Sequence, residues 1–543
     1  MKTILLPFKS QISAISSYTG NRVTNFTGNV ANKQNPSANP RHSEKWHFII
    51  LLMIIVMMLG FSNSGFGQTT GDYRSNATGN WNALATWQRY NGTSWATPTS
   101  GQGTPTNTSG AITIQSPNTV TVNVAISADQ VTINSGGTIM VGGLLNVQTF
   151  TIVDGTGDDL VNNGTLAIYA ACTVSVQGQL KNQGSIDVQY LAGFSANLNI
   201  VSGGTLKCST SIVSGGGNFS LASGGTIEIG STDGITTSGA TGNIQVTRTR
   251  TYAIGANYVY NGTSGAQAAG NGLPATVNSL TISNTAGVTL PSAIAVTNNL
   301  SITAGAFINL GSVTHTAGTL TLGGAGTASG SWGSTSSSAT YKNNSYFAAT
   351  TGIVNVNTDT RSTPGFSGLT ASQSICFGTS TVTLSGTVSA TGPVYPANGE
   401  TVSVTINSVA QIATIAGSAG GFSIIFPTAA IPASGSAYSI TYAYAGDGFL
   451  KPAPNNTSTT LKVNANPVAN ASQTPITCYG ANDATITVLV SGGQSPYYFS
   501  DDNGSSWVPA LPALGAGSWK FSDLLPGTPY RIKVKDSFGC ISK

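Results

Sequence analysis

Apolar and polar residues alternate in short runs along residues 138–229, and each run follows a small polar corner such as Ser-Gly-Gly or Asn-Gly. The runs begin at Thr138, Thr165, Ser185, Thr205 and Thr226, so the successive gaps are 27, 20, 20 and 21 residues. Alternation turns every second side chain toward a core. A period of about 20 residues is typical of a solenoid, because so small a coil must stack on its neighbours to bury its apolar side chains. The pattern therefore predicts a right-handed parallel β-helix, a solenoid, over residues 68–357.

The corners between the runs are rich in Gly and Asn, as in "VNNGTLAI" and "VSGGTLKC". Both residue types adopt positive φ more readily than others do. We therefore expect Asn and Gly together to supply the left-handed backbone of each sharp turn.

Aromatic residues gather ahead of the clear coils, in residues 71–95, where Trp81, Trp87 and Trp95 lie with two tyrosines. The end of a stack of coils needs a cap, because its last strand is an open edge. An aromatic N-terminal cap is therefore the favoured interpretation. The alternative is a platform on which the three tryptophans stack against glycans.

The alternating pattern changes its spacing beyond the solenoid. Residues 358–366 form a linker, and residues 367–465 contain longer alternating runs at intervals typical of a β-sandwich. Residues 466–543 form a last module of the same kind. The predicted fold class is all-β, with the solenoid followed by two immunoglobulin-like (Ig-like) β-sandwich domains.

Residues 1–67 have the features of a signal peptide with a long basic n-region. The apolar run Phe48–Leu59 has 12 residues, which as a helix rise about 18 Å and fall short of a hydrocarbon layer of about 30 Å. Gly65 and Gly67 supply the small residues of a cleavage site. We therefore expect a secreted or extracellular protein with no stable membrane span after cleavage.

The charge distribution argues against a nucleic-acid partner. Six of the 21 basic residues and one of the 17 acidic residues precede position 68, which leaves 15 basic and 16 acidic residues in the rest of the chain. A nearly neutral body lacks the basic surface that binds phosphate backbones.

The tail resembles the SprB-type repeat of gliding-motility adhesins, through "CYGANDATITVLVSGGQSPYYFS" and "YRIKVKDSFGC". Residues 375–463, with "GETVSVTIN" and "YSITYAYAGD", resemble bacterial Ig-like repeats, and the solenoid with its "GNWNALATWQRYNGTSW" start is similar to N-terminal parts of large secreted proteins from gliding bacteria. These resemblances imply a protein of the bacterial outer cell surface. Because the chain stops three residues after Cys540, we expect a truncated last repeat and a fragment of a longer protein.

The five cysteines give one expected disulfide. Cys478 and Cys540 bracket the last module, and an exported chain meets oxidising conditions. Cys172 and Cys208 follow corners that are two coils apart, so about 10 Å separates them and both are expected in the core. Cys376 has no apparent partner within its own domain.

Groups that carry chemistry are sparse in the sequence. His315, in the alternating run "GSVTHTAGTLTL", is expected to face solvent. Asp154, Asp158 and Asp159 cluster in a turn, where a solvated loop is the favoured interpretation and a calcium site the alternative. For the "DDNG" sequence from Asp501, a turn is likewise the favoured interpretation and a cation site is the alternative.

The predicted function is therefore a non-enzymatic surface adhesin or structural protein without a cofactor. Its solenoid is the stalk or binding platform, and its sandwiches are spacers or adhesive modules. Glycans, surface proteins or the substratum are the expected partners. The alternative is a secreted polysaccharide lyase or hydrolase built on the β-helix, which requires acids and bases on one face of adjacent coils.

Overall fold

A computed structural model of the chain describes residues 67–142, 148–155, 158–169, 172–177, 179–189, 192–193, 197–392, 394–509 and 517–543. The predicted signal peptide lies outside these residues except for Gly67. Within the described ranges the chain forms β-strands and one short 3₁₀ helix, η1 (Leu84–Thr86), which confirms the all-β prediction. None of the helices in these ranges combines the length and the apolar character that a membrane span requires.

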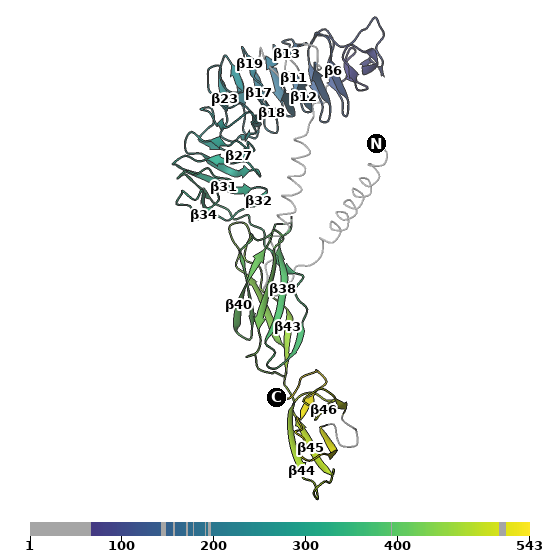
Figure 1. The fold of residues 1–543 in the computed structure, drawn as a ribbon. Helices are drawn as coiled ribbons and strands as arrows, with labels where there is room; N and C mark the ends of the chain where they lie inside the picture. The colour runs from purple at the N-terminus through teal and green to yellow at the C-terminus, as the bar shows by residue number, and fades with distance from the viewer. Residues whose placement is uncertain are drawn as a thin grey trace, which may run out of the picture. The chain divides into compact units, whose positions relative to one another are not determined.

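Parallel strands form three faces in the first part of the chain (Figure 1). The first face contains β1 (Tyr73–Ser75), β5 (Ile112–Ile114), β8 (Val131–Ile133), β11 (Asp158–Asn162), β14 (Gln179–Asn182), β17 (Leu198–Ile200), β20 (Phe219–Leu221) and β23 (Arg250–Tyr252). The second face contains β2 (Gly79–Asn80), β6 (Thr119–Val122), β9 (Thr138–Val141), β12 (Thr165–Ile168), β15 (Ser185–Val188), β18 (Thr205–Lys207), β21 (Thr226–Ile229), β24 (Asn257–Tyr260), β27 (Ser279–Ile282), β29 (Ala295–Ile302), β31 (Thr314–Leu322) and β35 (Ile353–Val356).

Shorter ladders form the third face. These are β7 (Ile126–Ala128), β10 (Thr149–Ile152) and β13 (Thr173–Val176), then β16 (Ala192–Gly193), β19 (Val213–Gly215) and β22 (Ile244–Val246), then β25 (Gln267–Ala268), β28 (Val288–Thr289) and β30 (Ile308–Asn309). At the two ends of the stack and beside the second face lie β3 (Trp87–Tyr90), β4 (Trp95–Ala96), β26 (Thr276–Val277), β32 (Ala325–Gly326), β33 (Gly330–Gly333) and β34 (Tyr341–Lys342).

The register of the second face follows the repeat in the sequence. Thr138, Thr165, Ser185, Thr205 and Thr226 stand opposite one another on successive strands. The residue after each of them points into the core and is fully buried, as Leu166, Ile186 and Leu206 are. The solenoid is confirmed by this register, and the right-handed sense of its winding stays a prediction.

Glycine at the corners has two separate roles. Gly203 has a φ of +85°, which is the left-handed conformation expected of a sharp turn. Gly184 is needed for a different reason, because a Cβ at this position would lie 2.1 Å from the carbonyl oxygen of Gly164 in the preceding coil. The recurrent glycine ahead of each run therefore lets neighbouring coils approach closely.

The asparagines of the corners do not adopt positive φ, contrary to our expectation. Asn162 and Asn182 are fully buried instead, and Nδ2 of Asn162 donates to Oδ1 of Asn182 over 2.6 Å. Nδ2 of Asn182 also donates to the carbonyl oxygen of Thr205 in the next coil. The amides thus satisfy backbone oxygens that the tight corner would otherwise bury unpaired.

The strands after the linker fold over a second core. They are β36 (Gly365–Ser367), β37 (Gln373–Cys376), β38 (Thr381–Ser389), β39 (Thr401–Ile406), β40 (Val409–Ala416), β41 (Gly421–Pro427), β42 (Tyr438–Tyr444) and β43 (Asn456–Asn464). Strand β40 pairs with β39 on one side and with β41 on the other, so it belongs to both layers of this sandwich. Strand β37 lies parallel to β43, which puts Cys376 at the end of the sandwich where β43 finishes. The Ig-like classification stays a prediction.

The terminal module has a much smaller core. One layer contains β44 (Val468–Thr474), β45 (Ala484–Ser491) and β48 (Ser518–Leu524), and the other contains β46 (Tyr498–Ser500), β47 (Val508–Pro509) and β49 (Lys533–Lys535). Its central apolar cluster contains three fully buried side chains, from Val488, Phe499 and Val534. So small a core indicates that the module depends on additional attachments for its stability.

Candidate functional site

Two of the three tryptophans in the aromatic segment seal the first coil. Trp81 and Trp87 are fully buried, with ring centroids 4.9 Å apart. Each indole N–H donates to a backbone oxygen, Trp81 to Pro105 over 2.9 Å and Trp87 to Trp81 over 2.8 Å. The cap interpretation fits these contacts, and rings buried in this way present no face to a sugar.

Trp95 lies at the edge of the same cap and is half-buried. The guanidinium of Arg74 lies 4.4 Å from the centroid of its ring, and Tyr90 packs beside it at 5.4 Å. Of the three predicted stacking residues, Trp95 therefore keeps some access to solvent, but arginine already covers one face of its ring.

The three aspartates of the predicted calcium turn are not assembled into a site. Asp154 and Asp158 are exposed, whereas Asp159 is fully buried and accepts a hydrogen bond from the backbone N of Gly155 over 2.8 Å. Across the residues that the structure describes, no three His, Cys, Asp or Glu side chains are grouped to hold a metal ion. Asp158 and Asp159 belong to strand β11 and not to a turn, which corrects that part of the expectation.

The turn at Asp501 to Gly504 is also held by its own hydrogen bonds. The carboxylate of Asp502 accepts from the backbone N of Ser505 and Ser506, each over 3.0 Å, and from the hydroxyl of Ser500 over 2.7 Å. Hydrogen bonds from Ser506 hold the pKa of Asp502 far below its usual range. The carboxylate of Asp502 therefore stabilises the turn by accepting these hydrogen bonds.

His315 faces the core, which corrects the expectation that it faces solvent. Its Nδ1 accepts from the backbone N of Ile294 over 3.2 Å, and we assign its proton to Nε2, which donates to the carbonyl oxygen of Leu310 over 3.0 Å. Burial lowers the pKa of this imidazole. The neutral ring therefore joins two corners and is unavailable as a general base.

Arg250 is a second buried titratable group that the sequence did not single out as buried. Its guanidinium donates to the carbonyl oxygen of Val246 over 3.1 Å and to the hydroxyl of Thr236 over 2.7 Å. Burial lowers its pKa. Arg250 thus ties the long loop before β22 to the solenoid, and its contacts show a structural role.

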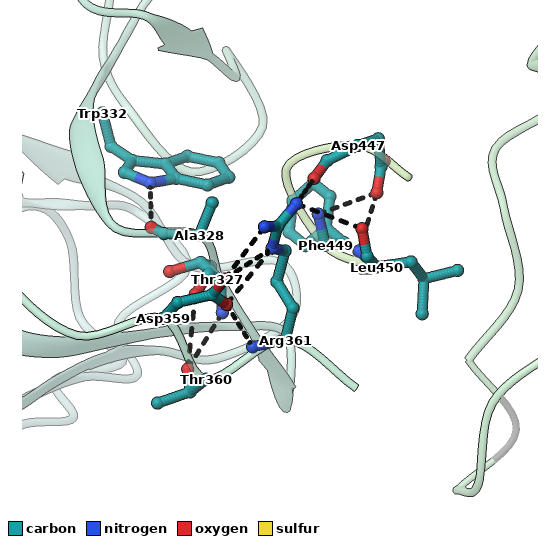
Figure 2. A network of polar contacts seen from close by, with 9 residues as sticks. All are labelled: Thr327, Ala328, Trp332, Asp359, Thr360, Arg361, Asp447, Phe449 and Leu450. Atoms are coloured by element: carbon teal, nitrogen blue, oxygen red, sulfur yellow. Dashed lines mark hydrogen bonds and ion pairs between the residues drawn. The ribbon is translucent and has the colours of Figure 1, made fainter. Parts of the chain in front are cut away.

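The solenoid meets the sandwich through a polar network around Arg361 (Figure 2). Nη2 of Arg361 lies 2.9 Å from Oδ2 of Asp359, and its Nη1 donates to the carbonyl oxygens of Asp447 and Leu450 in the sandwich. The hydrogen bond from Arg361 lowers the pKa of Asp359. The carboxylate of Asp447 accepts from the backbone N of Leu450 over 2.7 Å and so shapes the loop that Arg361 contacts.

Apolar contacts complete this junction. Trp332 is buried and stacks on Tyr341 with ring centroids 4.7 Å apart. Its ring also meets Phe449 of the sandwich edge-on at 5.4 Å, and Figure 2 labels both of these residues. The backbone N of Ala328 donates to the carbonyl oxygen of Gly448 over 2.9 Å. The 446–450 loop of the sandwich therefore covers the last coil.

The sandwich is joined covalently to the terminal module. Cys376 forms a disulfide with Cys540, with Cα atoms 5.3 Å apart, across 164 positions of sequence. The predicted bridge between Cys478 and Cys540 is therefore wrong, and Cys478 has an exposed free thiol.

The reason lies in the length of the module. Cys540 lies at the end where β44 begins, because Val468 and Ser542 line the same groove. Cys478 follows the other end of β44, and the strand rises about 20 Å between its ends. That separation far exceeds the reach of a disulfide, about 7 Å between Cα atoms.

The other two cysteines behave as predicted. Cys172 and Cys208 are buried, and the strands that precede them are two coils apart. Burial raises the pKa of the Cys208 thiol, and the nearby carboxylates of Glu228 and Asp187 raise it further. Burial of this kind makes the Cys208 thiol a poor nucleophile.

A comparison with protein-family models matches residues 470–506 to the SprB repeat. The match covers β44 to β46 and identifies a SprB-type repeat in the terminal module, as its resemblance predicted. A comparison with curated proteins found no match.

Two solved structures show a likeness to the chain. One is described as "Ca2+-stabilized adhesin helps an Antarctic bacterium reach out and bind ice", with 21% identity, a TM-score of 0.22 and coverage of 35% of this chain and 50% of that one. The other is described as "Structural insight into host cell surface retention of a 1.5-MDa bacterial ice-binding adhesin", with 17% identity, a TM-score of 0.21 and coverage of 36% and 68%. The chain thus spans half the length of the first, and TM-scores this low carry no conclusion about function.

Proposed function

We propose that the protein is a non-enzymatic adhesin or structural protein of the bacterial outer cell surface. The SprB-type repeat at residues 470–506 is the observation that carries this proposal. The solenoid acts as a stalk or binding platform, and the sandwich and terminal module act as spacers or adhesive units.

The chemistry of the described residues supports a role in contact. The buried imidazole of His315 and the buried guanidinium of Arg250 both donate hydrogen bonds to backbone carbonyl oxygens. The outward positions of the second face carry hydroxyls and a loose ion pair, with Nζ of Lys207 3.9 Å from Oε1 of Glu228. Such a surface suits polar contacts with glycans, surface proteins or the substratum.

Binding and turnover on a polysaccharide panel distinguish the adhesin from a polysaccharide-cleaving enzyme. The full chain is expected to bind at least one surface glycan saturably and to release no new reducing ends or unsaturated sugars. Release of product, lost on replacing Asp187 and Glu228 by Asn and Gln, would show the lyase or hydrolase instead.

Location is tested separately on intact producing cells. An antibody to the chain is expected to label them without permeabilisation, and external protease is expected to remove the label. Labelling only after permeabilisation would contradict the surface assignment.

A further inference from the structure

The sandwich and the terminal module contain the same cysteine turn. Cys376-Phe377-Gly378 closes with a hydrogen bond of 3.0 Å from the backbone N of Thr379 to the carbonyl oxygen of Cys376. Cys478-Tyr479-Gly480 closes in the same way, from Ala481 to Cys478, also over 3.0 Å. The glycines have φ values of +88° and +85°. The two turns are therefore equivalent positions of two successive modules.

The turn of the sandwich is occupied by the module that follows it. Cys376 is bonded to Cys540, Nδ2 of Asn466 donates to the carbonyl oxygen of Phe377 over 3.0 Å, and Nζ of Lys543 lies 5.7 Å from the Phe377 ring. Phe377, Pro432 and Val468 line a largely apolar groove between the two modules. This junction shows what such a turn binds.

The turn of the terminal module has no such partner within the described chain. Cys478 is an exposed free thiol and Tyr479 is 104% exposed, the highest value among the large apolar side chains of the described residues. A second groove lies beside it, lined by Pro475, Ile476, Leu525 and Tyr530 among others, and Leu525 is 51% exposed. The cysteine, the aromatic ring and the groove thus repeat the parts of the occupied junction.

We propose that this end of the terminal module, the Cys478 end, docks the Cys540 end of a further module of the same kind and forms a disulfide with it. The partner is defined by the occupied junction, so it presents a thiol equivalent to Cys540 and a basic residue equivalent to Lys543. A second copy of this chain whose Cys540 has been freed is such a partner. The inference rests on the repeated junction and holds whether or not the chain is adhesive.

The bond forms by thiol–disulfide exchange with a small disulfide such as oxidised glutathione. The thiolate of the incoming Cys540 attacks the small disulfide, forms a mixed disulfide and releases one small thiol. The Cys478 thiolate then attacks the Cys540 sulfur and releases the second small thiol. Two protein thiols are oxidised and one small disulfide is reduced to two thiols, so electrons and protons balance.

The test mixes two forms of the full chain in a glutathione buffer. The donor is Cys376→Ala/Cys478→Ala, in which Cys540 is free, and the acceptor is the unmodified chain, in which Cys540 is already bonded. The expected product is a one-to-one dimer on non-reducing gels, with Cys540 of the donor joined to Cys478 of the acceptor in the peptide map. The matched control acceptor is Cys478→Ala/Ser418→Cys, which moves the exposed thiol to a turn of the sandwich.

Docking is expected to make the reaction at Cys478 about tenfold faster than at residue 418, because it raises the effective concentration of the two thiols. Tyr479→Ala in the acceptor is expected to remove most of this advantage. Equal rates at the two positions, or a dimer joined through another cysteine, would overturn the proposal. Because the donor variant could fold poorly, the experiment is repeated with Cys376→Ser/Cys478→Ser and its circular dichroism is compared with the unmodified chain.

Discussion

The Cys376–Cys540 disulfide should decide which parts of the chain carry tension. If the protein is pulled from its two ends, force reaches Cys376 from the solenoid side and leaves through Cys540, so the covalent bond bypasses everything between them. The perturbation that removes the bypass is Cys540→Ala, or reduction of the unmodified chain. The sandwich strands after β37 and nearly all of the terminal module then come under load.

The size of the effect follows from the length of the bypassed segment. The two cysteines are separated by 164 positions, and their Cα atoms lie 5.3 Å apart. A fully extended chain gains roughly 3.6 Å per residue, so the disulfide withholds about 590 Å of extension. On the chain-entropy estimate, closing a loop of this length also stabilises the folded state by about 5 kcal/mol.

Single-molecule force spectroscopy with handles at the two ends measures this directly. The total extension at complete unfolding is expected to be about 590 Å greater for Cys540→Ala than for the oxidised unmodified chain. The matched control, Cys478→Ala, removes a thiol that forms no disulfide and is expected to leave the extension unchanged. Equal extensions for the oxidised chain and Cys540→Ala would refute the bypass.

Three further predictions concern the solenoid and its caps. Gly184→Ala is expected to destabilise the solenoid by about 1–3 kcal/mol in chemical denaturation, because its Cβ would meet the preceding coil; Gly216→Ala, with open space around it, is the control, and equal losses would contradict the close-approach argument. Trp87→Ala is expected to lower the free energy of unfolding by about 3–5 kcal/mol and to leave glycan binding by the folded protein unchanged. A loss of glycan binding without a loss of stability would instead support the stacking-platform interpretation. The Asp359–Arg361 pair lowers the folded pKa of Asp359, so its stabilisation is full above a pH of about 4 and is lost as the pH falls through the folded value. Arg361→Gln should therefore lower the melting temperature at pH 7 and matter less at pH 3, and an equal loss at both pH values would contradict this role.

The sequence predicted the parts of the fold that depend on local periodicity. Alternation and the gap of about 20 residues put Thr165, Ser185 and Thr205 opposite one another, because a strand and its copy in the next coil see the same surroundings. The solenoid was therefore predictable from the repeat alone. The preference for a cap over a platform rests on a general argument and stays a prediction, since the first coil exposes an edge that something apolar must cover.

His315 shows what residue type alone cannot decide. Its run alternates so that His315 shares the inward side with Ala317, and both are buried. The phase of the alternation was thus a usable signal. The polar character of the imidazole favoured the wrong side, and only the neighbouring corners, with Ile294 and Leu310, explain how a buried imidazole is satisfied.

The disulfide could not be predicted from the bracketing of a module by two cysteines. Proximity in sequence favours a bond between Cys478 and Cys540. The two residues lie at opposite ends of the module, however, because Cys478 follows the far end of β44 and Cys540 lies near its start. Cys376 lacked a partner only while each domain was considered by itself. The pairing depends on how the two modules pack against each other, because Cys376 and Cys540 belong to different ones.

The two ends of the solenoid show the same limit of local patterns. At the N-terminal end the cap is contiguous in sequence, and its concentration of aromatic residues marks it. At the other end Trp332 is covered by Phe449, which belongs to the sandwich and follows more than a hundred residues later. Because the open coil and its cover come from different domains, no single stretch of the sequence contains both and marks them as a cap. The sandwich is therefore the C-terminal cap of the solenoid as well as a module in its own right, and the Arg361 network holds the covering loop in place.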